Sequence, residues 1–226
     1  MDINIKKSSL KYQIAEGIKK EIFQGNLDPG DKVTENYIAK KLEVSRGPVR
    51  EAIQLLVMEG LLVSVTYKET RVSSITTEEV TELLIPMRIN METFALKKAY
   101  SSWNERHFEK FDELVDKMKR ATIFNDMPLF NEIDLQFHEL IIVSSNMNNL
   151  AHLWAGILNR IRLHFVHQNR LSLDLQKFTD EHEILLNTFK TGDLETAVQG
   201  LRDHIINTNM PRVELLPDQE NEHNKE

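Results

Sequence analysis

The chain has 226 residues, of which 41% are hydrophobic, and a formal net charge of −7, so it can bury the core of one large or two modest domains. It has no cysteine, which excludes a disulfide framework and any thiolate metal site. The first residues, Met1–Asn4, do not read as a signal peptide, and no apolar run approaches membrane-spanning length. We therefore expect a soluble, cytoplasmic protein without a membrane partner.

Charge is unevenly distributed along the chain. Residues 1–75 hold 12 Lys and Arg against 10 Asp and Glu, whereas residues 76–226 hold 16 against 25. An acidic surface repels phosphates, so only the first part is suited to nucleic acid. We predict two domains with different partners, over residues 1–75 and 76–212, followed by a polar, disordered tail over 213–226.

The N-terminal part predicts a helix, a second helix, a tight turn, a third helix and a β-hairpin. The helices are indicated by apolar residues at helical spacing and by N-cap and C-terminal glycine signals, and the strands by short apolar runs. The expected bounds are Leu10–Phe23, Thr34 to about Leu42 and Ser45–Gly60 for the helices, and Leu61–Val65, Tyr67–Thr70 and Arg71–Ile75 for strand, turn and strand. This order is typical of a winged helix-turn-helix.

The third of these helices has two faces. One face is apolar and would fill a small core together with residues of the preceding helix and turn. The core residues expected here are Ile38, Ala39, Leu42, Val44, Val49, Ile53 and Leu56. The opposite face carries Arg46 and Arg50, four residues apart, and Gln54.

A helix-turn-helix presents such a polar face to the major groove of DNA. Arginine there can donate two hydrogen bonds to a guanine or bind a phosphate, and Ser45 with the unpaired amides at the helix start suits a phosphate oxygen. Lys68 and Arg71 lie near the tip of the hairpin, from which they would reach the DNA backbone or minor groove. Taken alone, the two arginines are equally consistent with an ordinary solvated helix face.

From Thr76 onward the pattern is helical almost throughout. Each expected helix has one apolar face, and no alternating strand pattern occurs, which favours an antiparallel all-α bundle. The expected inward residues are, helix by helix, Val80, Leu83, Met87, Met91 and Phe94; Phe108, Phe111, Val115 and Met118; Phe130, Ile133, Phe137 and Ile141; Leu150, Trp154, Ile157 and Ile161; Phe178, Leu185 and Phe189; and Ala197, Leu201 and Ile205.

Four polar residues share these inward faces. Asp134 and His138 are four apart on one helix, and His182 and His204 lie on two later helices. A buried carboxylate is costly unless it is paired or bound to a cation, and three imidazoles with one carboxylate suit a divalent transition metal. Two alternatives stay open: hydrogen-bonded core histidines, and an ion pair between Asp134 and Arg162.

Four segments of the N-terminal part form a recognisable pattern: Gly30–Glu35, Ile38–Leu42, Val44–Ala52 and Leu56–Leu61. Together they resemble the signature of the GntR family of regulators. The resemblance implies that Ser45, Arg46 and Arg50 contact operator DNA and that the tip of the wing enters the minor groove. The sequence departs from the family at Lys68–Arg71, which lacks the usual wing glycine and includes an acidic residue.

Residues 78–208 resemble the FCD sensor domain of the FadR subfamily, with Asp134–His138 matching its Asp-x-x-x-His element. The resemblance implies that Asp134, His138, His182 and His204 bind a metal, with zinc expected before nickel or manganese, and that a small carboxylate binds beside it. Arg88 matches an arginine that often faces this pocket and would pair with an anionic effector. An internal salt bridge of Arg88 with Glu92 is an equal alternative.

We therefore predict a transcription regulator, most simply a repressor, and not an enzyme. It would bind double-stranded operator DNA as a homodimer, because helix-turn-helix proteins usually read palindromic half-sites, and a small organic acid would change its DNA affinity. A metal-dependent hydrolytic enzyme is one alternative, although the chain has no His-Glu-x-x-His, no Gly-x-Ser-x-Gly and no phosphate loop. A regulator with a purely structural metal site is the other.

Overall fold

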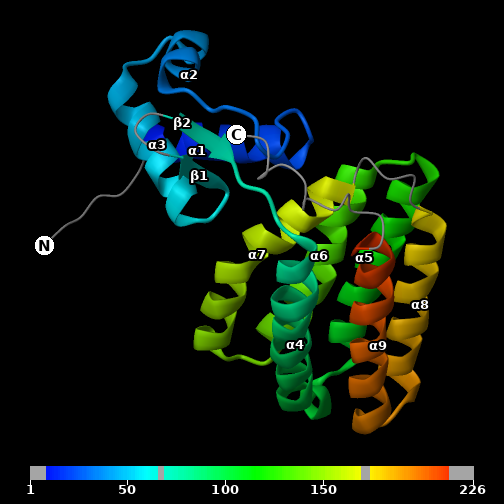
Figure 1. The fold of residues 1–226 in the computed structure, drawn as a ribbon. Helices are drawn as coiled ribbons and strands as arrows, with labels where there is room; N and C mark the ends of the chain where they lie inside the picture. The colour runs from blue at the N-terminus through cyan, green and yellow to red at the C-terminus, as the bar shows by residue number, and fades with distance from the viewer. Residues whose placement is uncertain (1–8, 66–68, 169–173, 214–226) are drawn as a thin grey trace, which may run out of the picture. The chain divides into compact units, whose positions relative to one another are not determined.

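The computed structural model describes residues 9–65, 69–168 and 174–213. The chain divides between Ser74 and Ile75 into two compact units, and both are mainly helical, which confirms the predicted fold class (Figure 1). Among the described residues, no helix is long and apolar enough to cross a bilayer. Lys68 and almost all of the expected tail lie outside the described residues.

The first unit has the predicted order of elements. The helices and strands are α1 (Leu10–Phe23), α2 (Glu35–Leu42), α3 (Arg46–Met58), β1 (Leu62–Val65) and β2 (Glu69–Val72). The bounds predicted for the second strand were wrong at both ends. Val65 pairs with Glu69 and Leu62 with Val72, so antiparallel pairing already begins in the segment that was expected to turn.

The segment before α2 runs along the other edge of β2. Gly30 adopts a left-handed φ of 87°, which glycine reaches without steric cost, and its N–H donates to the carbonyl of Val72 at 2.9 Å. The N–H of Val33 donates to the carbonyl of Thr70 at 2.8 Å. The Thr34 hydroxyl then accepts from the amide of Tyr37 as the N-cap of α2. These bonds join the helix-turn-helix to its wing.

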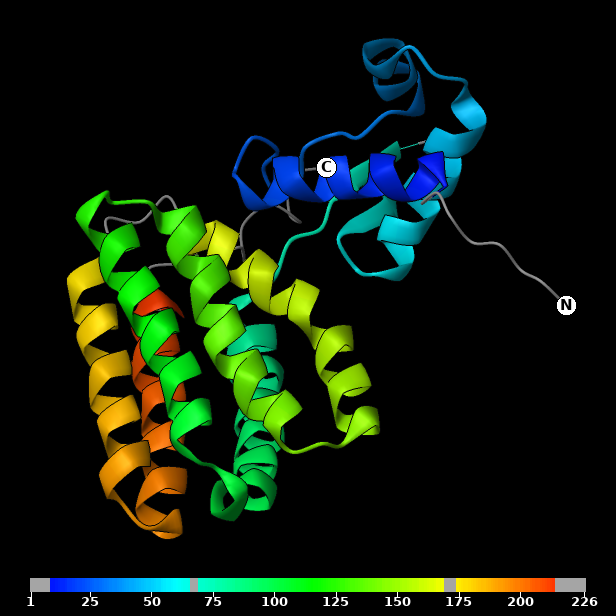
Figure 2. The same cartoon turned by 180° about the vertical axis from the view of Figure 1, so that it is seen from behind.

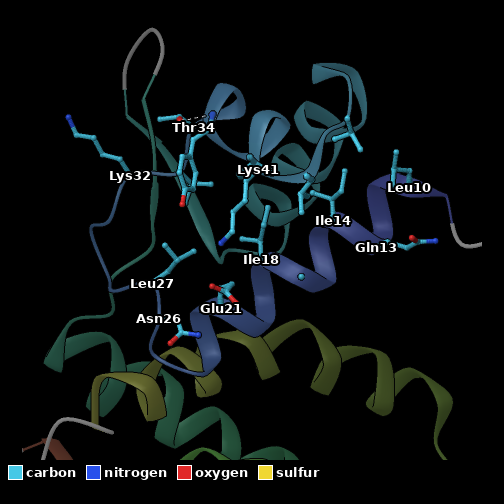
Figure 3. Close-up of a pocket in the computed structure, with 16 residues that line it drawn as sticks. Leu10, Gln13, Ile14, Ile18, Glu21, Asn26, Leu27, Lys32, Thr34 and Lys41 are labelled. Atoms are coloured by element: carbon cyan, nitrogen blue, oxygen red, sulfur yellow. Dashed lines mark hydrogen bonds between the residues drawn. The ribbon is translucent and has the colours of Figure 1, made fainter.

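Most of the core of the first unit comes from α1 and α3, since the described side chains of α2 contribute only Ala39 to it. The rest comes from the hairpin and the segment before α2, which bury Val33, Leu61, Leu62 and Val72. The prediction that Leu42 fills this core was wrong, since its side chain is 47% exposed. Leu42 instead lines an open, largely apolar groove of about 640 Å³ between α1 and α2, together with Leu10 and Leu27 (Figure 3). The buried apolar residues of α1 and α3 are Ile14, Ala15, Ile18, Ile22, Val49, Ala52, Ile53 and Leu56.

The second unit is a helical bundle, as predicted. Its elements are the π-helix η2 (Glu79–Leu84), α4 (Ile85–Ala99), the short 3₁₀-helix η3 (Tyr100–Ser102), α5 (Glu105–Ile123), α6 (Met127–Ser144), α7 (Asn148–Gln168), α8 (Leu175–Thr191) and α9 (Leu194–Val213). Helix α4 packs on α6 and α9, α5 packs on α6 and α8, and α8 packs on α9. Figure 2 shows the side of the bundle formed by α5, α6 and α7.

The inward face predicted for the first helix of this bundle was wrong in part. Val80 is buried, but Leu83 is 53% exposed and Phe94 is 41% exposed. The wider turn of the π-helix changes the angular position of the residues that follow, so the period of an α-helix does not extend across it. The inward positions of α4 include two charged residues, Arg88 and Glu92.

Aromatic rings join α5, α6 and α8. The ring centroids of Phe111 and Phe137 are 4.9 Å apart, and the ring of Phe189 stacks on that of Phe137 with a centroid distance of 6.4 Å. The rings of His182 and Phe137 pack in a T-shaped arrangement, with their centroids 5.1 Å apart. Because tightly packed rings leave little freedom to their helices, this layer determines where α6 and α8 hold their polar inward residues.

Replacing Phe111 by alanine tests this packing. Phe111 is completely buried, so we expect Phe111→Ala to lower the free energy of unfolding by about 3–5 kcal/mol. Phe124, at the end of the same helix, is 80% exposed, so Phe124→Ala should change the free energy of unfolding by less than about 0.5 kcal/mol. Urea unfolding of the two variants, followed by circular dichroism, makes the comparison. Equal losses would contradict the assigned core.

Candidate DNA interface and candidate metal centre

The outer face of α3 carries the side chains predicted to read DNA. Arg46, Arg50 and Gln54 are exposed, while the buried side of the helix faces the core. Ser45 is the N-cap residue of α3 and is exposed, but its side chain does not cap the helix. The structure thus brings together four of the six predicted DNA-binding residues at one exposed helix end and face.

Glu35 holds Arg50 in place. The Nε of Arg50 donates to Oε1 of Glu35 at 2.9 Å, and its Nη2 donates to Oε2 at 3.1 Å. The hydrogen bond from Arg50, together with the positive charge of this arginine, lowers the pKa of Glu35. A bidentate pair of this kind defines the plane of the guanidinium. The sequence placed Glu35 in a family segment but gave it no role, because the pair joins residues 15 positions apart.

Arg71 has partners within the wing. Its Nη1 donates to the carbonyl of Gly30 at 2.7 Å, and its Nη2 donates to Oε1 of Glu69 at the same distance. The first bond ties β2 to the segment before α2 and the second lies within β2, so a contact of Arg71 with DNA would compete with both. Its predicted companion Lys68 lies outside the described residues, and wing contacts stay a prediction.

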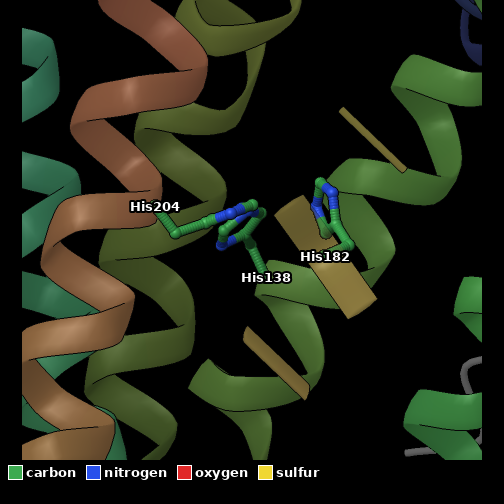
Figure 4. A group of neighbouring side chains, drawn as sticks. All are labelled: His138, His182 and His204. Carbon is green, nitrogen blue, oxygen red and sulfur yellow. The ribbon is translucent and has the colours of Figure 1, made fainter. Parts of the chain in front are cut away.

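The four predicted metal ligands are all buried in the second unit, on α6, α8 and α9. One ring nitrogen from each of His138, His182 and His204 lies within 4.8 Å of the others (Figure 4). Oδ1 of Asp134 is 3.2 Å from Nε2 of His182, but Asp134 does not belong to this compact group of three. The alternative pairing of Asp134 with Arg162 was wrong, because Arg162 donates to Glu132.

Several buried polar atoms of this cluster have no hydrogen-bond partner among the described residues. These atoms are Oδ2 of Asp134, Nε2 of His182 and both ring nitrogens of His204. Nδ1 of His182 lies 2.8 Å from the carbonyl of Phe178, which can only accept, so Nδ1 carries the proton and Nε2 presents its lone pair. Each unsatisfied buried group costs about 1–3 kcal/mol. A divalent cation would satisfy the lone pairs of Asp134, of Nε2 of His182 and of one ring nitrogen of His204 together, so the residues present fit a metal.

The electrostatics of the cluster favour the protonation states that bind metals. Burial lowers the pKa of His204 well below its usual value, which favours the neutral imidazole. Burial alone would raise the pKa of Asp134, but its close contact with His182 and the nearby positive charge of Arg88 outweigh burial and lower it. A neutral imidazole and an ionised carboxylate are the forms that coordinate a cation.

A second group of buried polar residues adjoins the cluster. Nε of Arg88 donates to Oε1 of Glu92 at 2.9 Å, and Oε2 of Glu92 is 2.5 Å from Nδ1 of His138. Burial would raise the pKa of Glu92, but its contacts with His138 and Arg88 outweigh burial and lower the pKa. The salt bridge between Arg88 and Glu92, one of the two alternatives for Arg88, is therefore present.

The outer edge of the Arg88 guanidinium is poorly satisfied. Among the described residues, Nη1 reaches only Oδ1 of Asn209, at 3.5 Å, and the buried Nη2 has no hydrogen-bond partner. The salt bridge therefore leaves the two terminal nitrogens of the guanidinium available for an anion. Sequence reasoning missed both Asn209 and the bond from Glu92 to His138, since each depends on how separate helices pack.

Comparisons with known proteins agree with this architecture. Residues 10–72 match the gntR family of bacterial regulatory proteins, and residues 83–207 match the FCD domain. The gluconate operon transcriptional repressor of Bacillus subtilis is 24% identical, over 88% of this chain and 84% of the repressor. The uncharacterized HTH-type transcriptional regulator YdhC of the same species is 28% identical, over 90% of this chain and 91% of that regulator. The crystal structure of a putative transcriptional regulator GntR from Rhodococcus sp. RHA1 is similar to this one, with a TM-score of 0.81 and 22% sequence identity. The match covers 93% of this chain and 100% of the Rhodococcus chain.

Matched substitutions compare the buried ion pair with an exposed one. Arg88→Met keeps most of the side-chain volume but leaves the Glu92 carboxylate buried without its arginine, and we expect a loss of about 3–5 kcal/mol in the free energy of unfolding. Lys190 pairs with Asp112 at the surface, where the two side chains are 36% and 51% exposed. Lys190→Met should cost at most about 1 kcal/mol. Similar losses in urea unfolding would contradict the burial of the first pair.

Proposed function

The chain belongs to the GntR family of bacterial regulatory proteins and carries an FCD domain, and on that premise we propose that it is a homodimeric repressor whose operator affinity is set by a small carboxylate bound beside a divalent metal. The matched domains and relatives are regulators of transcription and not enzymes. This argues against the hydrolytic enzyme that the sequence had left as an alternative.

The two-faced helix α3 carries the proposal of operator reading. Arg46, Arg50 and Gln54 are exposed in a line above a buried apolar face, as a recognition helix requires. We infer that the arginines read guanine in the major groove and that Ser45 and the first amides of α3 hold a phosphate. A homodimer would present two such helices to the two halves of a palindrome, about one helical turn of DNA apart.

The proposal of effector sensing rests on Arg88 and the three-histidine cluster. The terminal nitrogens of Arg88 can donate two parallel hydrogen bonds to a carboxylate, and Glu92 keeps the guanidinium in place. A bound metal would supply a Lewis acid for an oxygen of the same effector, with Asp134, His138, His182 and His204 as its ligands. One relative is a repressor of a gluconate operon, and gluconate is itself a carboxylate, which supports this class of effector.

The DNA proposal is tested by capturing genomic fragments on the purified protein, sequencing them and measuring binding by fluorescence anisotropy. We expect a short palindrome to be enriched. Arg50→Ala and Arg46→Ala should each weaken binding to it by roughly 5- to 150-fold. Arg106→Ala, which removes an exposed arginine from the second unit, should leave the affinity unchanged. The proposal fails if only salt-sensitive, sequence-independent binding is found, with and without cell extract to supply an effector.

The metal and effector proposal is tested on the same protein. Elemental analysis should find about one divalent ion per chain, and removal of this ion by a chelator should lower the unfolding temperature. His204→Ala should abolish metal binding, whereas His152→Ala, which removes an exposed histidine of α7, should not. Arg88→Lys keeps the positive charge but loses the planar guanidinium that can donate two parallel hydrogen bonds. It should therefore weaken carboxylate binding about tenfold while the metal content is unchanged.

A purely structural metal site is the second candidate, because three buried histidines would also stabilise the bundle without any effector. The two candidates differ in one measurement. If hydroxy acids, sugar acids and dicarboxylates leave operator affinity unchanged while chelation lowers the unfolding temperature, the metal site is structural and the sensing proposal is wrong.

A further inference from the structure

We infer that Glu92 is a positioning residue for the metal centre: it binds Nδ1 of His138 and thereby directs Nε2 of that histidine toward the metal. The inference rests on the metal site proposed above. It concerns a residue that lies outside the predicted ligand set and acts through one of its members.

The contacts of Glu92 define this role. Its side chain is fully buried, and each of its oxygens has a separate partner: Oε1 accepts from Arg88 and Oε2 accepts from His138. An ionised carboxylate can only accept, so Nδ1 of His138 carries a proton and Nε2 presents its lone pair. A histidine that binds a metal commonly has its second nitrogen bound to such a carboxylate, which sets the tautomer and the direction of the ring.

The other two histidines support this assignment by comparison. Nδ1 of His182 donates to a backbone carbonyl, that of Phe178, so this ring receives its orientation from its own helix. Within the described part of the chain, neither ring nitrogen of His204 has a hydrogen-bond partner. The orientation of His138 depends on Glu92, a residue 46 positions earlier in the chain and on a different helix. Metal affinity should therefore respond to a change on α4, which contributes no residue to the three-histidine group.

Glutamine at position 92 cannot replace glutamate here. Its amide offers one acceptor and one donor group, while Arg88 always donates. If the amide oxygen accepts from Arg88, the amide nitrogen faces Nδ1 of His138 and forces the proton to Nε2, where it blocks metal binding. If the amide is reversed, its nitrogen opposes the Nε–H of Arg88. Either the metal-binding tautomer of His138 or the hydrogen bond from Arg88 is therefore lost.

This reasoning predicts rescue by a second substitution. In Arg88→Met/Glu92→Gln, the arginine that dictates the amide orientation is absent, so the amide oxygen can turn to His138. The Nδ1–H tautomer should then return. The double variant also contains no uncompensated buried charge at these two positions, which favours folding. A purely structural role for Glu92 would give no such recovery.

The experiment combines a spectroscopic measurement with metal binding. Long-range proton–nitrogen correlation spectra of the full-length, metal-free protein report the tautomer of His138, and competition with a coloured chelator reports its affinity for Zn²⁺. We expect Glu92→Gln to move the proton to Nε2 and to lower Zn²⁺ affinity by about 10- to 100-fold. Glu82→Gln removes the same charge from an exposed site of η2 and should change neither. Arg88→Met/Glu92→Gln should recover the tautomer and most of the affinity.

The outcomes separate this inference from the proposal on which it rests. If wild-type protein binds no Zn²⁺ or other divalent ion, the proposal of a metal site is wrong, and the inferred role of Glu92 is wrong as well. If the wild type binds Zn²⁺ and Glu92→Gln binds it equally well, the inference alone is overturned. A shift of tautomer without loss of affinity overturns it as well. If Glu92→Gln does not fold, failure of the double variant to show the Nδ1–H form decides against the inference.

Discussion

A helical bundle can hold charge in its interior only where each charge meets a counter-charge or a cation, and the second unit depends on this constraint. Arg88, Glu92 and Asp134 are all nearly inaccessible to solvent, together with three imidazoles. The first two residues compensate each other directly. Of the residues that the structure describes, Asp134 meets His182 alone, and its second oxygen has no partner there. The negative charge that remains uncompensated, that of Asp134, is located where a cation would fit. The electrostatics of the core and the proposed metal site are therefore one feature.

The same constraint links ligand binding to packing. The cluster draws on α6, α8 and α9, and Glu92 connects it to α4, so each of these helices contributes a polar group to one buried site. Because the groups that would hold a cation come from separate helices, the free energy of metal binding would also stabilise their association. An effector anchored by Arg88 and the metal would act on that same set of helices. A bundle organised in this way is suited to converting ligand binding into a change of helix packing.

The sequence predicted features that depend on local spacing and missed those that depend on packing between elements. The two faces of α3 and the inward position of Asp134 and His138 follow from helical periodicity, and the structure has both. Leu83 was assigned to the wrong face, because nothing in the sequence indicated a π-helix before α4. Asp134 was paired with Arg162 as one alternative, since spacing cannot tell which acid on α6 a neighbouring helix meets. The bond from Glu92 to His138 joins two helices and has no signal in periodicity.

The two units use the same pair of residue types for opposite purposes, and burial decides which. Arg50 and Glu35 form a bidentate pair at the surface, where water and salt weaken the attraction, so guanine or phosphate oxygens can replace Glu35 at little cost. Arg88 and Glu92 form their pair in the core, where separating them would leave two unsolvated charges. Arg88 therefore keeps its carboxylate and has only its terminal nitrogens available for a ligand. An exposed pair suits an arginine that must change partners on DNA, whereas a buried pair suits one that must keep its place while an effector binds and leaves.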